Sequence, residues 1–170
     1  MPRIHVCPLA HIDRTVAETG ARSMVTIINV GTPVTRPREI ASDRHLYIGV
    51  SDILTPMQGH ILPGRAHIET LVDFVRAWDR REPLLIHCFA GVSRSTAAAF
   101  ISACALAPHR DEAAIAQAIR AASPTATPNA KLVEAADEAL GRKGRMTAAI
   151  AGIGRGADCY EGAPFALEIA

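Results

Sequence analysis

The chain has 170 residues, which predicts one domain large enough to bury a substantial hydrophobic core. Its net charge of +1 gives no reason to expect nucleic acid or an anionic membrane as a partner. Aromatic residues make up only 4% of the chain, too few for the stacking platforms that bind single-stranded nucleic acid. Apolar residues make up 49%, which is ordinary for a soluble globular protein.

Hydrophobic patterns predict strands that alternate with helices. Apolar runs predict strands at Ile4–Cys7, Met24–Val30, His45–Val50 and Leu84–Ile86, and an edge strand at Phe165–Ile169. Periodicity and capping signals predict helices at His11–Thr19, from Pro63 to about Trp78, at Ser95–Leu106, at Asp111–Ala122 and near Met146–Ile150. A further helix is predicted to have Thr127 as its cap and Pro128 in its first turn, and to end just before Gly141. This alternation predicts an α/β fold with a central, mostly parallel sheet of four to five strands flanked by helices. We expect a single domain over residues 1–170, with a core at about 4–141 and a glycine-rich extension at 142–170 packed on it.

The cysteines and the N-terminal residues indicate a cytoplasmic protein. Four scattered cysteines with no CxxC pair are typical of reduced thiols rather than a disulfide framework. The first residues lack the pattern of a secretory signal, and no apolar run approaches the ~20 residues of a membrane span. The histidines show no metal-ligand spacing, and we expect His60 and His67 on the surface or in loops. We therefore expect no metal and no cofactor.

The segment PLLIHCFAGVSRSTAAA, residues 83–99, carries the strongest functional signal. It predicts a buried strand, a loop that contains Gly91 and an alanine-rich helix. In such a loop the backbone N–H groups and the helix dipole converge on one point and form an anion site. Cys88 stands where the strand ends, and Arg94 follows after five residues.

A second Cys-x5-Arg match, from Cys104 to Arg110, lacks this setting. It has no glycine, contains Pro108 and falls where a helix ends. It therefore offers no loop of converging N–H groups. The context rather than the spacing makes the first match specific.

Each side chain of the first match has a structural and a functional interpretation. Cys88 is either a small buried hydrophobe or a thiolate nucleophile that displaces a phosphoryl group, since the helix N-terminus and Arg94 both favour the thiolate. Arg94 is either a surface helix residue or a bidentate ligand for two phosphate oxygens. Ser95 is either an ordinary helix-start residue or a donor to the cysteine sulfur. We expect the phosphate to lie against the loop residues between the cysteine and the serine: Phe89, Ala90, Gly91, Val92, Ser93 and Arg94.

The motif HCFAGVSRS resembles the signature loop of the cysteine-dependent protein tyrosine phosphatases, nearest to the compact dual-specificity-like bacterial type. The similarity extends over roughly residues 4–140. The resemblance implies an aspartate as general acid on a mobile loop, roughly thirty to forty residues before the cysteine. Asp52 lies at that distance, directly after a predicted strand and at the start of the long Ser51–Pro63 loop. Asp43 is the rival acid, but it precedes that strand and should lie at its far end.

The resemblance also implies supporting residues. Asn129, in the sequence PNAKL, matches a helix-start motif whose asparagine helps hold the signature loop. His87 would orient the loop backbone and help keep the thiolate ionised, while its structural interpretation is a core histidine with satisfied hydrogen bonds. No lysine lies within the loop, whereas inositol-lipid phosphatases of this superfamily often have basic residues there.

These residues predict a phosphatase that hydrolyses phosphate monoesters, phosphotyrosine above all, with dual specificity as a further option. Its partner would be a phosphorylated protein or a small aryl phosphate, with no nucleic acid and no membrane. The alternatives are a phospho-ligand-binding module without turnover and a thiol-based sulfur- or arsenate-transfer enzyme. Cys7 could form a reversible disulfide with Cys88 if their strands are neighbours. The sequence leaves the physiological substrate, the oligomeric state and the role of the tail open.

Overall fold

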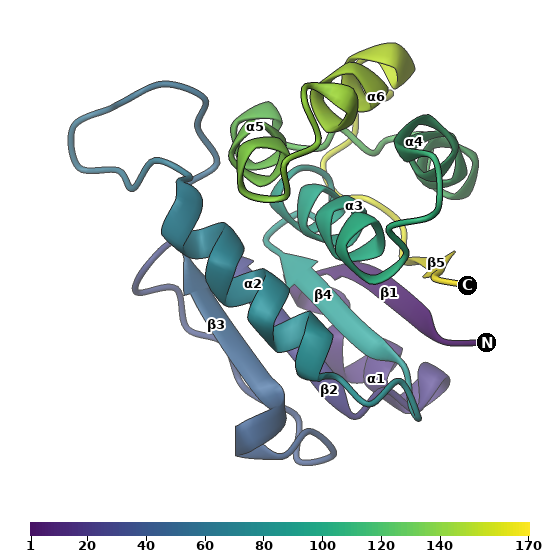
Figure 1. Cartoon of the computed structure of the whole chain (residues 1–170). Coiled ribbons are helices and arrows are strands. Elements are labelled where there is room, and N and C mark those ends of the chain that lie inside the picture. The colour runs from purple at the N-terminus through teal and green to yellow at the C-terminus, as the bar shows by residue number, and fades with distance from the viewer.

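The computed structural model describes residues 1–170 and contains one five-stranded sheet flanked by six α-helices (Figure 1). The strands, in the order β3-β2-β4-β1-β5, are β1 (Arg3–Pro8), β2 (Ser23–Ile28), β3 (His45–Gly49), β4 (Leu84–Cys88) and β5 (Phe165–Glu168). All neighbouring pairs are parallel except β1 and β5, which are antiparallel. The predicted α/β class, with a mostly parallel sheet, is confirmed.

Helices cover both faces of the sheet. They are α1 (Ile12–Thr19), α2 (Arg65–Ala77), α3 (Arg94–Leu106), α4 (Glu112–Ala122), α5 (Ala130–Ala139) and α6 (Arg145–Ile153). In Figure 1, α1 lies behind the sheet, while α2 and α3 cross its front and α4 to α6 form a further layer around α3. No helix is long and apolar enough to span a bilayer.

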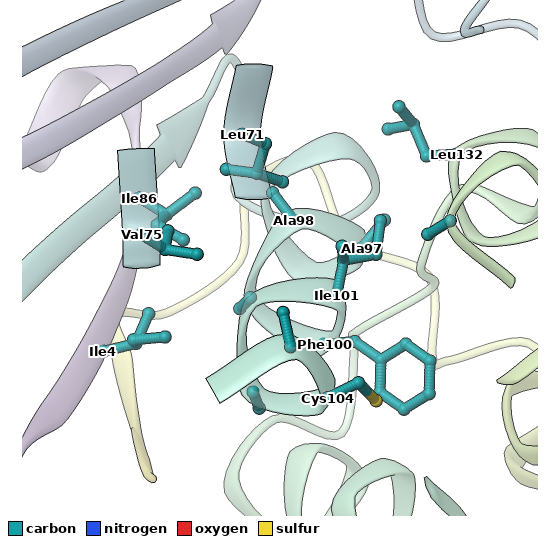
Figure 2. Close-up of a cluster of buried hydrophobic side chains, with 14 of the residues drawn as sticks. Ile4, Leu71, Val75, Ile86, Ala97, Ala98, Phe100, Ile101, Cys104 and Leu132 are labelled. Atoms are coloured by element: carbon teal, nitrogen blue, oxygen red, sulfur yellow. The ribbon is translucent and has the colours of Figure 1, made fainter. Parts of the chain in front are cut away.

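The centre of the larger core is α3, in which all 13 residues are buried. Its alanines lack bulky side chains, so the sheet and the neighbouring helices can pack closely around it. Figure 2 shows part of this core. The side chains labelled there come from the sheet, α2, α3 and α5, and include Ile4, Ile86, Leu71, Val75, Phe100, Ile101, Cys104 and Leu132. A helix surrounded by protein on all sides holds its first residue, Arg94, at a fixed position.

Residues 142–170 add to this same core. Helix α6 packs against α4 and α5 and buries Met146 and Ile150. Strand β5 pairs with β1 from Arg3↔Glu168 to Val6↔Phe165, and it buries Phe165 and Leu167. The predicted edge strand is therefore confirmed.

Most predicted boundaries differ by one to three residues from those in the structure, and three of these differences are described here. The strand predicted to reach Val30 ends at Ile28, and Val30 is exposed. Helix α2 does not begin at Pro63, because Gly64 is its N-cap. The Gly64 N–H donates a hydrogen bond to His67 Nδ1 at 3.0 Å. His67 therefore lies in the first turn of α2, partly exposed to solvent.

The third error concerns the cap of α5. The sequence predicts Thr127 as the cap of this helix with Pro128 in its first turn, but the cap is Asn129, whose Oδ1 accepts from the Leu132 N–H at 2.9 Å. Pro128 therefore lies outside the helix. The loop predicted at Ser51–Pro63 has no regular structure and protrudes from the body in Figure 1.

Candidate active site

The candidate site lies at the carboxyl edge of the sheet. Residues 88–94, here the signature loop, connect the end of β4 to the start of α3. Asn29 follows β2 and Val50 follows β3, so both lie beside this loop at the same edge. Open α/β sheets bind ligands outside the carboxyl ends of their strands.

Backbone hydrogen bonds fix the orientation of the signature loop. Four of its carbonyl groups each accept a backbone N–H from another segment: Phe89 from Leu9 (3.0 Å), Ala90 from Gly162 (2.8 Å), Val92 from Thr127 (2.9 Å) and Ser93 from Asn129 (3.1 Å). In a trans peptide the N–H points away from the carbonyl of the same unit. Because these carbonyls point outward to their donors, the N–H groups of the same four units point toward the inside of the loop. This is the arrangement that binds an anion.

Gly91 is the residue that permits this turn. Its φ is +70°, in the left-handed region that favours glycine. A Cβ at this position would lie 2.8 Å from the backbone nitrogen of Pro8. Any other residue would therefore strain the loop and push it away from β1.

The thiol of Cys88 faces the inside of this loop. The side chain is buried, and its Sγ accepts a hydrogen bond from the Gly91 N–H at 3.3 Å. Ser95 Oγ lies 3.0 Å from the same sulfur. The predicted proximity of Ser95 to Cys88 is thus present, and both contacts can stabilise negative charge on sulfur.

One nitrogen of the Arg94 guanidinium group is held by the protein. Its Nη1 donates to Asn29 Oδ1 at 2.6 Å and to the Val50 carbonyl at 3.0 Å. Its Nε is the one buried side-chain nitrogen or oxygen without a hydrogen-bond partner. A buried donor without a partner costs free energy, and an anionic oxygen beside Nε would supply the missing acceptor.

Asp52 reaches the signature loop from the start of the protruding loop. Its Oδ1 accepts from Ser93 Oγ at 2.7 Å and from Asn129 Nδ2 at 2.9 Å. The side chain of Asn129 therefore holds Asp52 and the Ile53 carbonyl (3.3 Å), while its backbone N–H holds the signature loop. The resemblance implied only the second of these contacts.

His87 lies directly beneath the loop and is fully buried. Its Nδ1 is 3.0 Å from the Cys88 carbonyl, which can only accept, so Nδ1 carries the proton. Its Nε2 then accepts from Thr26 Oγ1 at 2.7 Å, and that hydroxyl accepts from His45 Nε2 at 2.7 Å. Burial lowers the pKa of His87 to about 4, so the ring is neutral at pH 7.

A cavity of about 290 Å³ opens in front of the cysteine. Its lining joins most of the predicted site residues with one cysteine that the sequence did not indicate: Asp52, Cys88, Phe89, Ala90, Val92, Ser93, Arg94 and Cys159. Phe89 is half exposed and forms part of the rim. Gly91 contributes its N–H rather than a lining surface.

Two further candidates lie elsewhere. Asp43 lies in the 3-10 turn before β3, at the amino edge of the sheet and beside Ser23. Cys7 pairs in register with His87, so its side chain is on the opposite face of the sheet from Cys88. Burial raises the pKa of Cys7 to about 12, so this thiol stays protonated.

The comparison with solved structures confirms the predicted fold. No protein-family model and no curated protein sequence matches the chain. Human DUSP28 aligns with a TM-score of 0.63 at 19% identity, over 82% of this chain and 89% of that one. The PTP-2 phosphatase of Cydia pomonella aligns with a TM-score of 0.62 at 20% identity, over 79% and 84%. PTPMT1 aligns with a TM-score of 0.58 at 16% identity, over 88% and 94%. The chain therefore has the fold of the cysteine-dependent tyrosine and dual-specificity phosphatases.

Sequence reasoning missed three residues of the site. Asn29 follows a buried strand directly, and a polar residue at a strand's carboxyl end is a signal that could have been used. Thr26 lies inside a strand and gave no signal. Cys159 reaches the cavity only because of the path of the C-terminal segment, which no local pattern predicts.

Proposed function

We propose that the protein is a phosphatase that hydrolyses phosphate monoesters through a phosphocysteine intermediate, with phosphotyrosine as the preferred substrate class. The unpartnered, buried Nε of Arg94 carries this proposal. It lies in the loop whose N–H groups point inward, and Arg94 and Cys88 line one cavity. A phosphate dianion in that cavity would give Arg94 its missing acceptor and would present phosphorus to a sulfur nucleophile.

The first step transfers the phosphoryl group to sulfur. The Cys88 thiolate donates an electron pair to phosphorus, and the bond from phosphorus to the ester oxygen breaks. Asp52 in its acid form protonates the departing oxygen. Both hydrogen bonds to this carboxyl group go to Oδ1, so Oδ2 is available to hold the transferable proton.

The second step releases inorganic phosphate. Asp52, now a carboxylate, takes a proton from a water molecule as the water attacks the phosphocysteine. The sulfur leaves with the electron pair of the S–P bond. Ser95 Oγ, 3.0 Å from Sγ, stabilises this departing thiolate.

A rapid acid quench of the enzyme during turnover of p-nitrophenyl phosphate tests the proposal. We expect a phosphoryl group on Cys88, detected by peptide mass spectrometry, and release of p-nitrophenol. Binding of phosphopeptide without release of phosphate at any pH would contradict the proposal and would favour a binding module. A phosphoryl group on any other residue would also contradict it.

A further inference from the structure

The glycine-rich tail passes along the signature loop. Residues 154–162, here the strap, connect the end of α6 to the segment that precedes β5. The Gly156 N–H donates to Thr127 Oγ1 at 3.0 Å, and the Ala157 N–H donates to the Pro124 carbonyl at 2.9 Å. Further along, the Gly162 N–H donates to the Ala90 carbonyl at 2.8 Å. The strap is therefore bonded both to the turn before α5 and to the signature loop itself.

Two glycines allow this close approach. A Cβ on Gly156 would lie 2.5 Å from the carbonyl carbon and oxygen of Thr125, which are backbone atoms that cannot move aside. A Cβ on Gly162 would lie 2.9 Å from the Gly91 carbonyl oxygen. Neither glycine has a positive φ, so it is space rather than backbone conformation that requires glycine here.

The strap lines a second cavity next to the one that contains Cys88. This cavity, of about 240 Å³, is formed by the signature loop, the acid, the turn before α5 and the strap: Asp52, Val92, Ser93, Thr127, Arg155, Gly156, Ala157, Asp158 and Cys159. Asp52, Val92, Ser93 and Cys159 line both cavities. The two cavities are therefore contiguous, and Cys159 stands on their common border from the strap side.

From this geometry we propose that the strap forms a subsite for the peptide chain that carries the phosphate. The inference rests on the proposed function, because the phosphate must occupy the cavity of Cys88. The leaving oxygen must then face Asp52 to receive its proton, and Asp52 borders the strap cavity. The group attached to that oxygen then leaves the cavity past Asp52, where the strap forms one wall. A phosphotyrosyl residue within a peptide is long enough to contact it, whereas the subsite adds little to free phosphotyrosine.

The test compares two substrates with the same phenol leaving group, free phosphotyrosine and an extended phosphotyrosyl peptide. Gly156→Ala displaces the strap at Thr125, outside the signature loop. Ala157→Trp is a second variant at an exposed position that lines the strap cavity and not the cavity of Cys88, so its indole occupies only the space of the peptide. The matched control is Gly152→Ala in α6, where a Cβ would meet nothing within 4 Å.

We expect both strap variants to lower the ratio of kcat/KM for the peptide over kcat/KM for free phosphotyrosine by about tenfold. The Gly152→Ala control should leave this ratio unchanged. Ratios that stay within about twofold of the parent in both strap variants would overturn the inference, as would equal losses on both substrates. A parent protein that hydrolyses neither substrate would instead refute the proposed function, so the two failures are distinguishable.

Discussion

Two segments of this chain have the same Cys-x5-Arg spacing, and only one forms a loop whose N–H groups point inward. Cys88 and Arg94 flank a turn between β4 and α3, and both line one cavity. Cys104 lies in the last turns of α3, buried in the hydrophobic core, and burial raises the pKa of its thiol to about 12. Arg110 lies beyond the end of that helix and donates to the Glu168 carbonyl at 2.8 Å.

The comparison shows what the spacing requires from its surroundings. Around Cys88, Gly91 reverses the chain, and four outward carbonyls leave N–H groups directed inward. After Cys104 the N–H groups continue the hydrogen bonds of α3 as far as Ala107, and Pro108 has no N–H, so no ring of converging N–H groups forms. The same residue type is therefore the proposed nucleophile in one place and a core side chain in the other.

The largest expected effect tests the two cysteines, each replaced separately by alanine. Cys88→Ala should lower kcat/KM for p-nitrophenyl phosphate by at least ~10⁴-fold, because the nucleophile is lost. Cys104→Ala should leave kcat/KM within about twofold of the parent while it lowers thermal stability, since it removes a buried sulfur. Equal activities of the two variants in steady-state assays would contradict the difference between the segments.

The two arginines provide the next test. Arg94→Lys should lower kcat/KM by about 10²- to 10³-fold, because an ammonium group cannot bind two phosphate oxygens from one edge. The same substitution should weaken competitive inhibition by inorganic phosphate. Arg110→Lys is the matched control at a half-buried position away from the site and should leave both measurements unchanged. If inorganic phosphate inhibits the Arg94→Lys variant as strongly as the parent, the proposed contact of Arg94 with two phosphate oxygens is refuted.

A smaller effect is expected at the acid. Asp52→Asn should slow hydrolysis of phenyl phosphate, which has a poor leaving group, by about 10- to 100-fold. Hydrolysis of p-nitrophenyl phosphate should slow much less, because its leaving group needs little protonation. Asp43→Asn, at the opposite edge of the sheet, should change neither rate. Equal slowing of both substrates by Asp52→Asn would remove the acid assignment.

The smallest expected effect concerns His87, the buried histidine that precedes Cys88. The residue that precedes Cys104 is an alanine. The folded-state pKa of His87 is about 4, below the value of 6.5 for an unperturbed histidine. Below pH 6.5 the unfolded chain therefore binds a proton that the folded protein does not bind. The contribution of His87 to stability is complete above pH 6.5 and is lost as the pH falls toward 4.

Urea unfolding at pH 7 and pH 5 measures this contribution. The parent should lose about 2 kcal/mol more than His87→Gln between these pH values. Burial also lowers the pKa of His5, but His5 is present in the two proteins and cancels in the difference. Burial lowers the pKa of His45 as well, and because His45 shares the Thr26 hydroxyl with His87, the difference reports on His87 together with its effect on His45. An identical pH dependence in the two proteins would show that His87 titrates normally.

The sequence is most informative where its signals are local. Alternating apolar runs predict all five strands, and the strand–glycine–helix context alone locates the signature loop. Capping is harder, because Thr127 and Asn129 are both good N-caps and only the packing of α5 selects Asn129. Asn29 had a usable signal, its place at the carboxyl end of a buried strand, whereas Cys159 could not be assigned because it reaches the site through a chain segment that is distant in sequence.

The Gly162–Ala90 hydrogen bond has a consequence for synthesis of the protein on the ribosome. A nascent chain that has emerged only as far as residue 141 contains Cys88, Arg94 and Asp52, but the Ala90 carbonyl lacks its donor and β1 lacks the strand at its edge. Contacts between such distant parts of a chain form late in folding. The loop therefore reaches its finished geometry only after residues 162–168 have left the exit tunnel and have bonded to Ala90 and β1.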